Sequence, residues 1–294
     1  MVQIESYSSH LTKRLNVIEE KMMALLDVST IKEFRNDPNS IVYSISPHYY
    51  FADSDENQTR IQAELGGIFA EWVEHLHLLT QNLPSNKKRE LKQLEDFVFK
   101  WIDRTGGLWG LPATIDEAKK AFSAEIKNYR ELLRFLIGED TEDYVFVPDT
   151  NALIAAPDIT AYRKYFGDVS YSVVITPTVT SELDRLKIVH RDEKFRDKVN
   201  AVIIRIKGWR NQGNLSQGVT VDKTITLKSV ANEPDFDNTL SWLDKNNEDD
   251  KLLASVLELQ RKNLNSMVIL VTSDINLQNK AELANFPYLE APDS

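Results

Sequence analysis

The sequence of 294 residues contains no cysteine, five histidines and no long apolar run. The lack of cysteine excludes disulfides, thiolate metal sites and cysteine nucleophiles, and five scattered histidines leave little material for a histidine-rich zinc site. Any bound metal ion must therefore be held mainly by oxygen. No apolar segment is long enough to span a bilayer, and residues 1–15 lack the apolar core of a secretion signal. These absences predict a cytoplasmic protein with no membrane partner.

Positive charge is also scarce, because 35 lysines and arginines face 45 acidic residues and leave a net charge of -10. Phosphate binding depends largely on lysine and arginine displacing counterions, so this balance argues against broad, non-specific adhesion to nucleic acid. It does not exclude a nucleic-acid enzyme. A site that gathers carboxylates for metal ions adds negative charge locally, and the bound cations offset that charge.

The composition is that of a soluble globular protein, and the length favours two structural units. Apolar residues recur at helical spacing in residues 5–28, 61–83, 91–102 and 114–136, which predicts amphipathic helices. Residues 41–57 fit a short strand and an irregular connection equally well. The spacing of Trp72, Trp101 and Trp109 is more typical of core residues than of a base-stacking platform. We therefore predict a mainly α-helical domain at residues 1–140, with its boundary in the polar stretch 138–143.

The pattern changes in residues 141–294. Short apolar runs at 144–147, 172–176 and 267–272 alternate with helical stretches near Asn151 and at 179–190, 195–209 and 249–262. Such alternation predicts an α/β domain with a parallel sheet flanked by helices. Residues 219–227 alternate with a period of two, which fits an extra strand or a hairpin.

Two aspartates directly follow apolar strands. Asp149 comes after the run that stops at Pro148, and Asp274 comes after residues 267–272. The carboxyl ends of strands form the ligand-binding edge of an open α/β sheet, so both aspartates lie where ligands usually bind. Aspartate, threonine and asparagine also cap helices, and taken alone each motif fits a cap better than a site. The polar residues that accompany the two aspartates are Thr150, Asn151, Ser273 and Asn276.

Two further acidic motifs lie at predicted helix starts. Glu182 falls in the first turns of a helix that follows a strand, and Glu248, Asp249 and Asp250 crowd the start of the helix at 249–262. The helix dipole favours an acidic residue at such a position. It explains three adjacent like charges poorly, because each raises the cost of ionising the next unless a cation is present.

The conjunction of these motifs is more specific than any one of them. Strand ends that are distant in sequence converge on one edge of a parallel sheet, so the four carboxylates of Asp149, Glu182, Asp250 and Asp274 are expected there together. Mg2+ and Mn2+ select hard oxygen ligands. One such ion can activate water and a second can stabilise a leaving oxygen at phosphorus, without any side-chain nucleophile.

In the order of these motifs, residues 144–287 resemble the PIN-domain nuclease superfamily. The resemblance implies catalysis by Asp149, Glu182, Asp250 and Asp274 at a Mg2+ or Mn2+ site. Asp249 could share or take the role of Asp250, and Asn276 also belongs to the site. It places Thr150, Asn151 and Ser273 beside the substrate. The implied activity is that of a phosphodiesterase that acts on RNA and leaves a 5′-phosphate. The helices before residue 134 carry no motif of a known family.

A basic stretch at residues 185–210 follows Glu182 in this acidic chain. A phosphate-binding face and a solvated helical face both explain it, and its place next to the acidic motifs favours the first. The residues predicted to contact the substrate backbone are Lys187, Arg191, Lys194 and Lys198.

We therefore expect an endoribonuclease for single-stranded RNA, with a helical half that sets substrate, protein partner or activity state. A deoxyribonuclease or structure-specific nuclease fits the same chemistry, and a non-catalytic RNA-binding or protein-binding module fits the same fold. The complete acidic set argues against the module. A haloacid-dehalogenase-like phosphatase fits less well, because it needs a second aspartate where this chain has Asn151. The oligomeric state stays open.

Overall fold

The computed structural model describes residues 6–34, 48–104, 111–137 and 143–292. It divides into two compact units, one comprising Leu11–Leu136 and the other Ile137–Ser294 together with Met1–His10. Trp109 and most of the predicted boundary stretch lie outside the described residues, so the boundary at residue 140 stays a prediction. No helix in the described part of the chain is long and apolar enough to cross a membrane.

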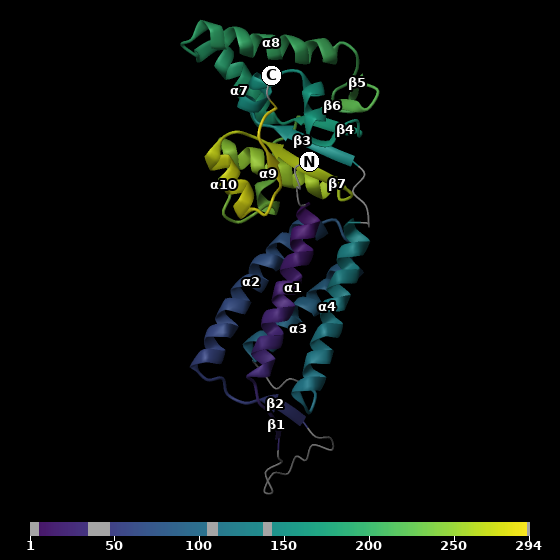
Figure 1. Ribbon diagram of the computed structural model, residues 1–294, viewed down its shortest axis with the longest axis vertical. Coiled ribbons are helices and arrows are strands. Elements are labelled where there is room, and N and C mark those ends of the chain that lie inside the picture. The colour runs from purple at the N-terminus through teal and green to yellow at the C-terminus, as the bar shows by residue number, and fades with distance from the viewer. Residues whose placement is uncertain (1–5, 35–47, 105–110, 138–142, 293–294) are drawn as a thin grey trace. The chain divides into compact units, whose positions relative to one another are not determined.

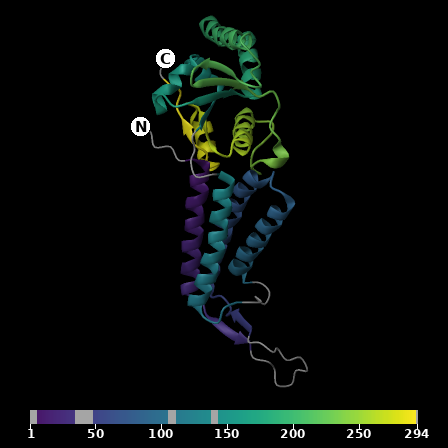
Figure 2. The ribbon, with the colours of Figure 1, turned by 90° about the vertical axis from the view of Figure 1, so that its right-hand side faces the viewer.

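The N-terminal unit is a bundle of helices, as the spacing predicted (Figures 1 and 2). Helix α2 begins before the predicted residue 61 because Asp55 and Gln58 form a capping box. Helix α3 begins directly after Pro84, which is suited to a helix start. The bundle consists of α1 (Tyr7–Asp27), α2 (Glu56–Thr80), α3 (Ser85–Asp103) and α4 (Ile115–Ile137).

Aromatic side chains fill the core of this bundle. Trp72 is fully buried, its ring lies 5.1 Å from that of Tyr129, and its indole N–H donates to the Leu11 carbonyl at 2.9 Å. Trp101 is also buried, 5.9 Å from the ring of Phe122. Both tryptophans therefore pack the core, as their spacing favoured.

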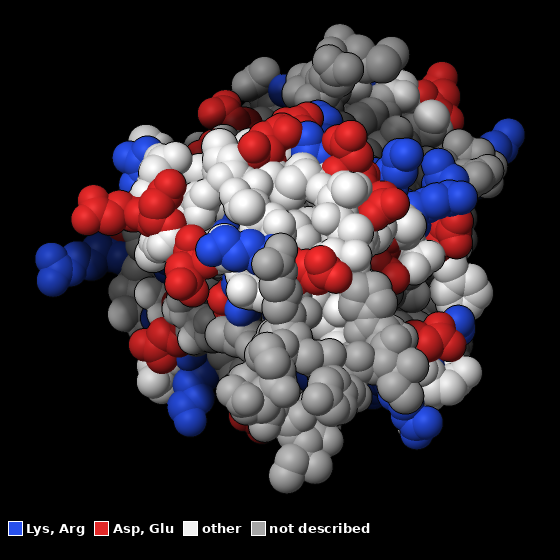
Figure 3. Space-filling view, turned by 90° about the horizontal axis from the view of Figure 1, so that it is seen from below, with Lys and Arg blue, Asp and Glu red and all other residues white. Residues whose placement is uncertain are grey.

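Two short strands, β1 (Ile31–Phe34) and β2 (His48–Phe51), pair antiparallel beyond the helices. Strand β2 falls in the segment at 41–57, whose residues 41–47 lie outside the described part of the chain. Figure 3 looks onto the molecule from this end, and acidic and basic side chains are interspersed there among the described residues.

The C-terminal unit contains a sheet with the strand order β5-β6-β4-β3-β7-β8 in its described part. Neighbouring strands are parallel except β5 and β6, which form an antiparallel hairpin. The predicted α/β fold with a largely parallel sheet is thus confirmed. The strands are β3 (Asp143–Pro148), β4 (Tyr171–Ile175), β5 (Val219–Asp222), β6 (Ile225–Ser229), β7 (Ser266–Val271) and β8 (Tyr288–Leu289).

Helices flank this sheet, with α5 in contact with β3 and α9 in contact with β7, while α7 and α8 pack against each other (Figure 1). The central strands are mostly apolar, and Phe146 and Ile269 are fully buried. The flanking elements are α5 (Thr150–Ala155), η1 (Ile159–Tyr162), α6 (Arg163–Phe166), α7 (Pro177–Val189), α8 (Glu193–Arg210), η2 (Phe236–Asn238), α9 (Glu248–Lys262) and α10 (Ile275–Leu283).

Candidate active site at the carboxyl edge of the sheet

Asp149 lies at the end of the central strand β3 and is 6% exposed. Its backbone N–H donates to the Val271 carbonyl at 2.9 Å, which continues the pairing of β3 with β7. Its carboxylate accepts from the backbone of Ala152 at 2.6 Å and from the Thr272 hydroxyl. Asp149 is therefore a helix cap, and it is also a nearly buried charge at the ligand-binding edge.

Thr272 connects Asp149 to the second aspartate. Asp274 follows β7 and caps α10, where its Oδ1 accepts from the backbone of Asn276 at 2.7 Å and of Leu277 at 3.2 Å. The hydroxyl of Thr272 accepts from the Asp274 backbone at 3.0 Å while it donates to Asp149. Thr272 is fully buried and was not predicted as a site residue. Its signal in the sequence is a hydroxyl at the end of an otherwise apolar strand.

Thr150 connects the third acidic residue to the same edge. Glu182 lies in α7, and its Oε2 accepts from the Thr150 hydroxyl at 2.6 Å. Its Oε1 is 3.4 Å from the guanidinium of Arg185. Thr150 is buried, and its hydroxyl is hydrogen-bonded to Glu182 instead of to solvent. Hydroxyls of two threonines thus donate to the carboxylates of Asp149 and Glu182, and Thr272 also holds the backbone of Asp274 near the ends of β3 and β7.

The electrostatics of Asp149 follow from this arrangement. Burial raises the pKa of the Asp149 carboxyl above its ordinary value, and hydrogen bonds from Thr272 and Ala152 oppose that rise. The negative charges of Asp274 and Glu182 raise the pKa further. The three carboxylates therefore repel one another, and a bound cation would relieve the repulsion.

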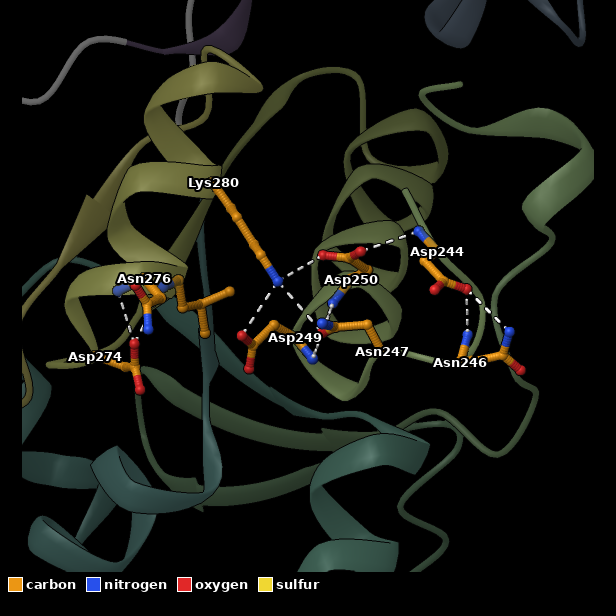
Figure 4. Close-up of polar contacts among 9 residues, drawn as sticks. Asp244, Asn246, Asn247, Asp249, Asp250, Asp274, Asn276 and Lys280 are labelled. Carbon is orange, nitrogen blue, oxygen red and sulfur yellow. Dashed lines mark hydrogen bonds and ion pairs between the residues drawn. The ribbon is translucent and has the colours of Figure 1, made fainter. Parts of the chain in front are cut away.

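The fourth acidic residue has a different partner. Asp250 lies in the first turn of α9, is 6% exposed, and accepts from the Asp244 backbone at 2.9 Å. Its Oδ1 forms an ion pair with Lys280 of α10 at 2.8 Å, and Lys280 also contacts Asp249 at 3.2 Å (Figure 4). The structure therefore joins Asp250 to Lys280, and its polar contacts do not link Asp250 to the other three carboxylates.

Lysine side chains pair with the three adjacent acidic residues at the start of α9. Lys251 pairs with Glu248 at 2.9 Å, and Lys280 pairs with Asp249 and Asp250. The sequence led us to expect a bound metal ion as the compensating cation, and Lys280 was not predicted to lie at the site. Its contribution depends on the packing of α10 beside α9, which no local pattern in the sequence reveals.

Residues 146–290 match the family model described as PIN domain. The C-terminal half of the chain is a PIN domain. The resemblance at residues 144–287 is thereby confirmed. PIN domains are generally nucleases and typically use divalent metal ions, which agrees with a site built from carboxylates. Among curated proteins, none matches this chain.

The residues of the PIN domain suit a hard divalent cation in their chemistry. Asp149, Glu182 and Asp274 offer carboxylate oxygens, and burial together with the charges of Asp274 and Glu182 raises the pKa of Asp149. In the conformation of the described residues, no three acidic or histidine side chains converge closely enough to coordinate a metal ion. Side-chain rotation at Glu182 or Asp274 would have to accompany binding. The remaining predicted residues Asn151, Ser273 and Asn276 are exposed.

The predicted basic face lies on α7, on α8 and on the turn between them. Lys187, Arg191, Lys194 and Lys198 are exposed to solvent. Arg196 has a different role, because its guanidinium donates to the His190 carbonyl at 2.6 Å and so fixes the turn between the two helices. The helical pair thus presents four positive charges that follow Glu182 in the sequence.

Proposed function

We propose that the PIN domain is a divalent-cation-dependent endoribonuclease that hydrolyses phosphodiester bonds of single-stranded RNA. The observation that carries this proposal is the buried carboxylate of Asp149, which Thr272 links by hydrogen bonds to the backbone of Asp274. Burial and the charges of Asp274 and Glu182 raise the pKa of this carboxylate. Perturbed carboxylates at the carboxyl edge of a parallel sheet are typical of a catalytic site. Membership of a family of nucleases supports the same conclusion.

In the proposed reaction, water attacks phosphorus, the bond to the 3′ oxygen breaks, and that oxygen takes up a proton. The products are a 5′-phosphate and a 3′-hydroxyl. Bound Mg2+ or Mn2+ would supply positive charge for the activation of water and for the leaving oxygen. Asp149 is preorganised for this task because two hydrogen bonds fix its carboxylate. Thr150 holds one oxygen of the Glu182 carboxylate near the same edge.

Substrate binding is assigned to the exposed basic side chains of α7 and α8. A chain with a net charge of -10 needs local positive charge to bring a phosphate backbone to a cluster of carboxylates. We infer that Lys187, Arg191, Lys194 and Lys198 supply it. The helical unit is assigned to the choice of substrate or of a protein partner.

The test is an assay of the purified full chain on labelled single-stranded RNA and on DNA of the same sequence. We expect RNA cleavage with Mg2+ or Mn2+, none with EDTA, and products that carry a 5′-phosphate. The matched control is Asp149→Asn purified in parallel, because a contaminating nuclease would be present in both preparations. Equal cleavage of DNA would instead indicate a deoxyribonuclease or structure-specific nuclease. RNA binding without cleavage by the wild-type protein would indicate a non-catalytic module.

A further inference from the structure

Lys280 reaches from α10 towards the first turn of α9 and ends among three oxygen atoms (Figure 4). Its Nζ lies 2.8 Å from Asp250 Oδ1, 3.2 Å from Asp249 Oδ2 and 3.3 Å from Asn247 Oδ1. Asn247 is the residue that caps α9 through the backbone N–H groups of Asp249 and Asp250. The ammonium group therefore occupies a ready-made cluster of oxygen ligands.

We propose that Lys280 is a built-in cation of the PIN domain, which offsets part of the negative charge of Asp249 and Asp250 and confines divalent-ion binding to the side of Asp149, Glu182 and Asp274. This inference rests on the proposed function, because it assigns the division of the same acidic site into two halves. In one half, Lys280 pairs with both carboxylates. In the other half, Arg185 pairs with Glu182 alone, and Asp149 and Asp274 depend on an ion from solution.

The contacts of Asp250 support this division. One of its carboxylate oxygens is used by the Asp244 backbone and the other faces Lys280. The side chain of Asp250 is 8% exposed and that of Lys280 is 25% exposed, so water screens their attraction only in part. A divalent ion could coordinate Asp250 only by displacing the ammonium group from a half-buried position. A carboxylate already paired with lysine is thus a poor ligand for a second cation.

The two halves differ in the groups that hold their carboxylates. Asp149 accepts from a hydroxyl and a backbone N–H, which orient the carboxylate but bring no full positive charge. Asp249 and Asp250 share one ammonium group. Both halves meet at α10, which begins after Asp274 and carries Lys280. Lys280 is therefore a positioning residue for the proposed reaction, acting through Asp249 and Asp250.

The experiment is a titration of the full chain with Mn2+, in which free Mn2+ is followed by electron paramagnetic resonance. Lys280→Met removes the charge and keeps much of the side-chain volume. Lys262→Met is the matched control, because Lys262 lies on α9 and pairs with Glu258 at 2.5 Å. We expect Lys280→Met to bind Mn2+ on the order of tenfold more tightly, or to bind an additional ion, because repulsion from one nearby unit charge is removed. The control should follow the wild-type isotherm.

Thermal unfolding with and without Mn2+ tests the same division of the acidic site. In EDTA, Lys280→Met should lower the melting temperature because Asp249 and Asp250 lose their cation, and Mn2+ should raise it by more than in wild type. If Lys280→Met does not fold, Lys280→Gln removes the same charge and keeps a side-chain donor for Asp250. It should again bind Mn2+ more tightly than wild type.

The outcomes separate this inference from the proposed function. Identical Mn2+ isotherms for wild type and Lys280→Met, with binding lost in Asp149→Asn, would overturn the role of Lys280 and leave the metal site intact. Weaker Mn2+ binding in Lys280→Met would also overturn it, because Lys280 would then help divalent ions to bind. Absence of Mn2+ binding in every variant would contradict the proposed function, and the inference with it.

Discussion

Both units of the protein bury carboxylates, and the groups that surround Glu95 in one unit differ from those that surround Asp149 in the other. Glu95 in the helical unit is 1% exposed, and it is 2.5 Å from Nε2 of His77 and 3.7 Å from the ammonium group of Lys92. Asp149 in the PIN domain is 6% exposed, and its hydrogen bonds come from Thr272 and Ala152. Its charged neighbours, Asp274 and Glu182, are acidic.

This difference separates a structural charge from a functional one. A buried carboxylate beside a histidine and a lysine is compensated within the fold, so its removal leaves the partners unpaired and costs stability. A buried carboxylate beside other carboxylates destabilises the fold by electrostatic repulsion, and the binding of a cation or a proton relieves that repulsion. The comparison predicts that changes at Asp149 act on activity and changes at Glu95 act on stability.

The largest effect is expected from Asp149→Asn, which removes the buried carboxylate assigned to function. The amide keeps the cap to Ala152 and loses the charge, so cleavage should fall at least about a hundredfold, the scale on which loss of one charge-stabilising group slows an enzyme. RNA binding should stay close to wild type. Single-turnover cleavage and a binding titration measure the two. Retained activity would reduce Asp149 to a helix cap.

The stability of Asp149→Asn relative to wild type should also depend on pH. Because the pKa of Asp149 is raised in the fold, protonation stabilises the native state below the ordinary carboxyl value of 3.8, and this contribution is lost as pH rises through the folded pKa. In EDTA at neutral pH, Asp149→Asn should therefore be at least as stable as wild type. Its advantage should shrink as the pH falls towards 3.8. Urea unfolding across this range measures the trend, and an advantage that grows in acid would be inconsistent with a raised pKa.

The next largest effect concerns the neighbours Asp249 and Asp250. The Asp250 side chain is 8% exposed and fixed by the Asp244 backbone, whereas that of Asp249 is 41% exposed. Asp250→Ala should cost more cleavage than Asp249→Ala by about tenfold or more, as expected when a fixed group near a metal site is lost. Asp250→Asn, which can still accept from the Asp244 backbone, controls for local unfolding. The opposite ranking in a cleavage assay would assign the third acidic role to Asp249.

A smaller effect is expected on the basic face. Replacement of Arg191, Lys194 and Lys198 by glutamine should weaken RNA binding and lower the slope of affinity against salt by about 2, because single strands release roughly 0.7 counterions per phosphate neutralised. Cleavage at saturating RNA should change less, since these residues are assigned to binding. The matched control replaces Lys87, Lys88 and Arg89 in the helical unit. An effect from the control set alone would move the binding face to that unit.

The smallest effect is expected from Glu95→Gln, which removes the buried carboxylate assigned to stability. It should cost about 1 to 2 kcal/mol of unfolding free energy, once solvent screening of the half-exposed His77 is allowed for, and leave cleavage unchanged. The hydrogen bond to Glu95 raises the pKa of His77, so its stabilisation is complete below the ordinary histidine value of 6.5 and is lost as pH rises through the folded value. The deficit should therefore shrink in alkaline buffer. Glu90→Gln, which breaks an exposed pair with Lys87, is the control.

Much of this arrangement could be predicted from the sequence. Apolar runs that stop abruptly at Asp149 and before Asp274 mark two strand ends, and parallel strands bring their ends to one edge. Apolar spacing also located the long helices, although polar first turns concealed the starts of α2 and α3. Strand β8 has two residues, which is too short for any pattern to appear.

The contacts that decide the chemistry were out of reach. The hydroxyl of Thr272 meets Asp149 across 123 positions in the sequence, and Thr150 meets Glu182 across 32. Lys280 reaches Asp250 only because α10 packs beside α9. Local patterns specify elements and their ends, whereas these pairs depend on how the elements pack. The sequence therefore predicted which carboxylates follow strand ends and helix starts, but it could not predict which of them pair with a lysine.

The most direct test of the account is a crystal structure of the protein grown with Mn2+, with the anomalous signal of manganese used to locate bound ions. The account predicts a peak coordinated by Asp149 and Asp274, with Lys280 still paired to Asp250. The same peak should be absent in Asp149→Asn crystals grown under identical conditions. A map without a peak at Asp149, or with its strongest peak between Asp249 and Asp250, would contradict the central claim that Asp149 and Asp274 form the metal site.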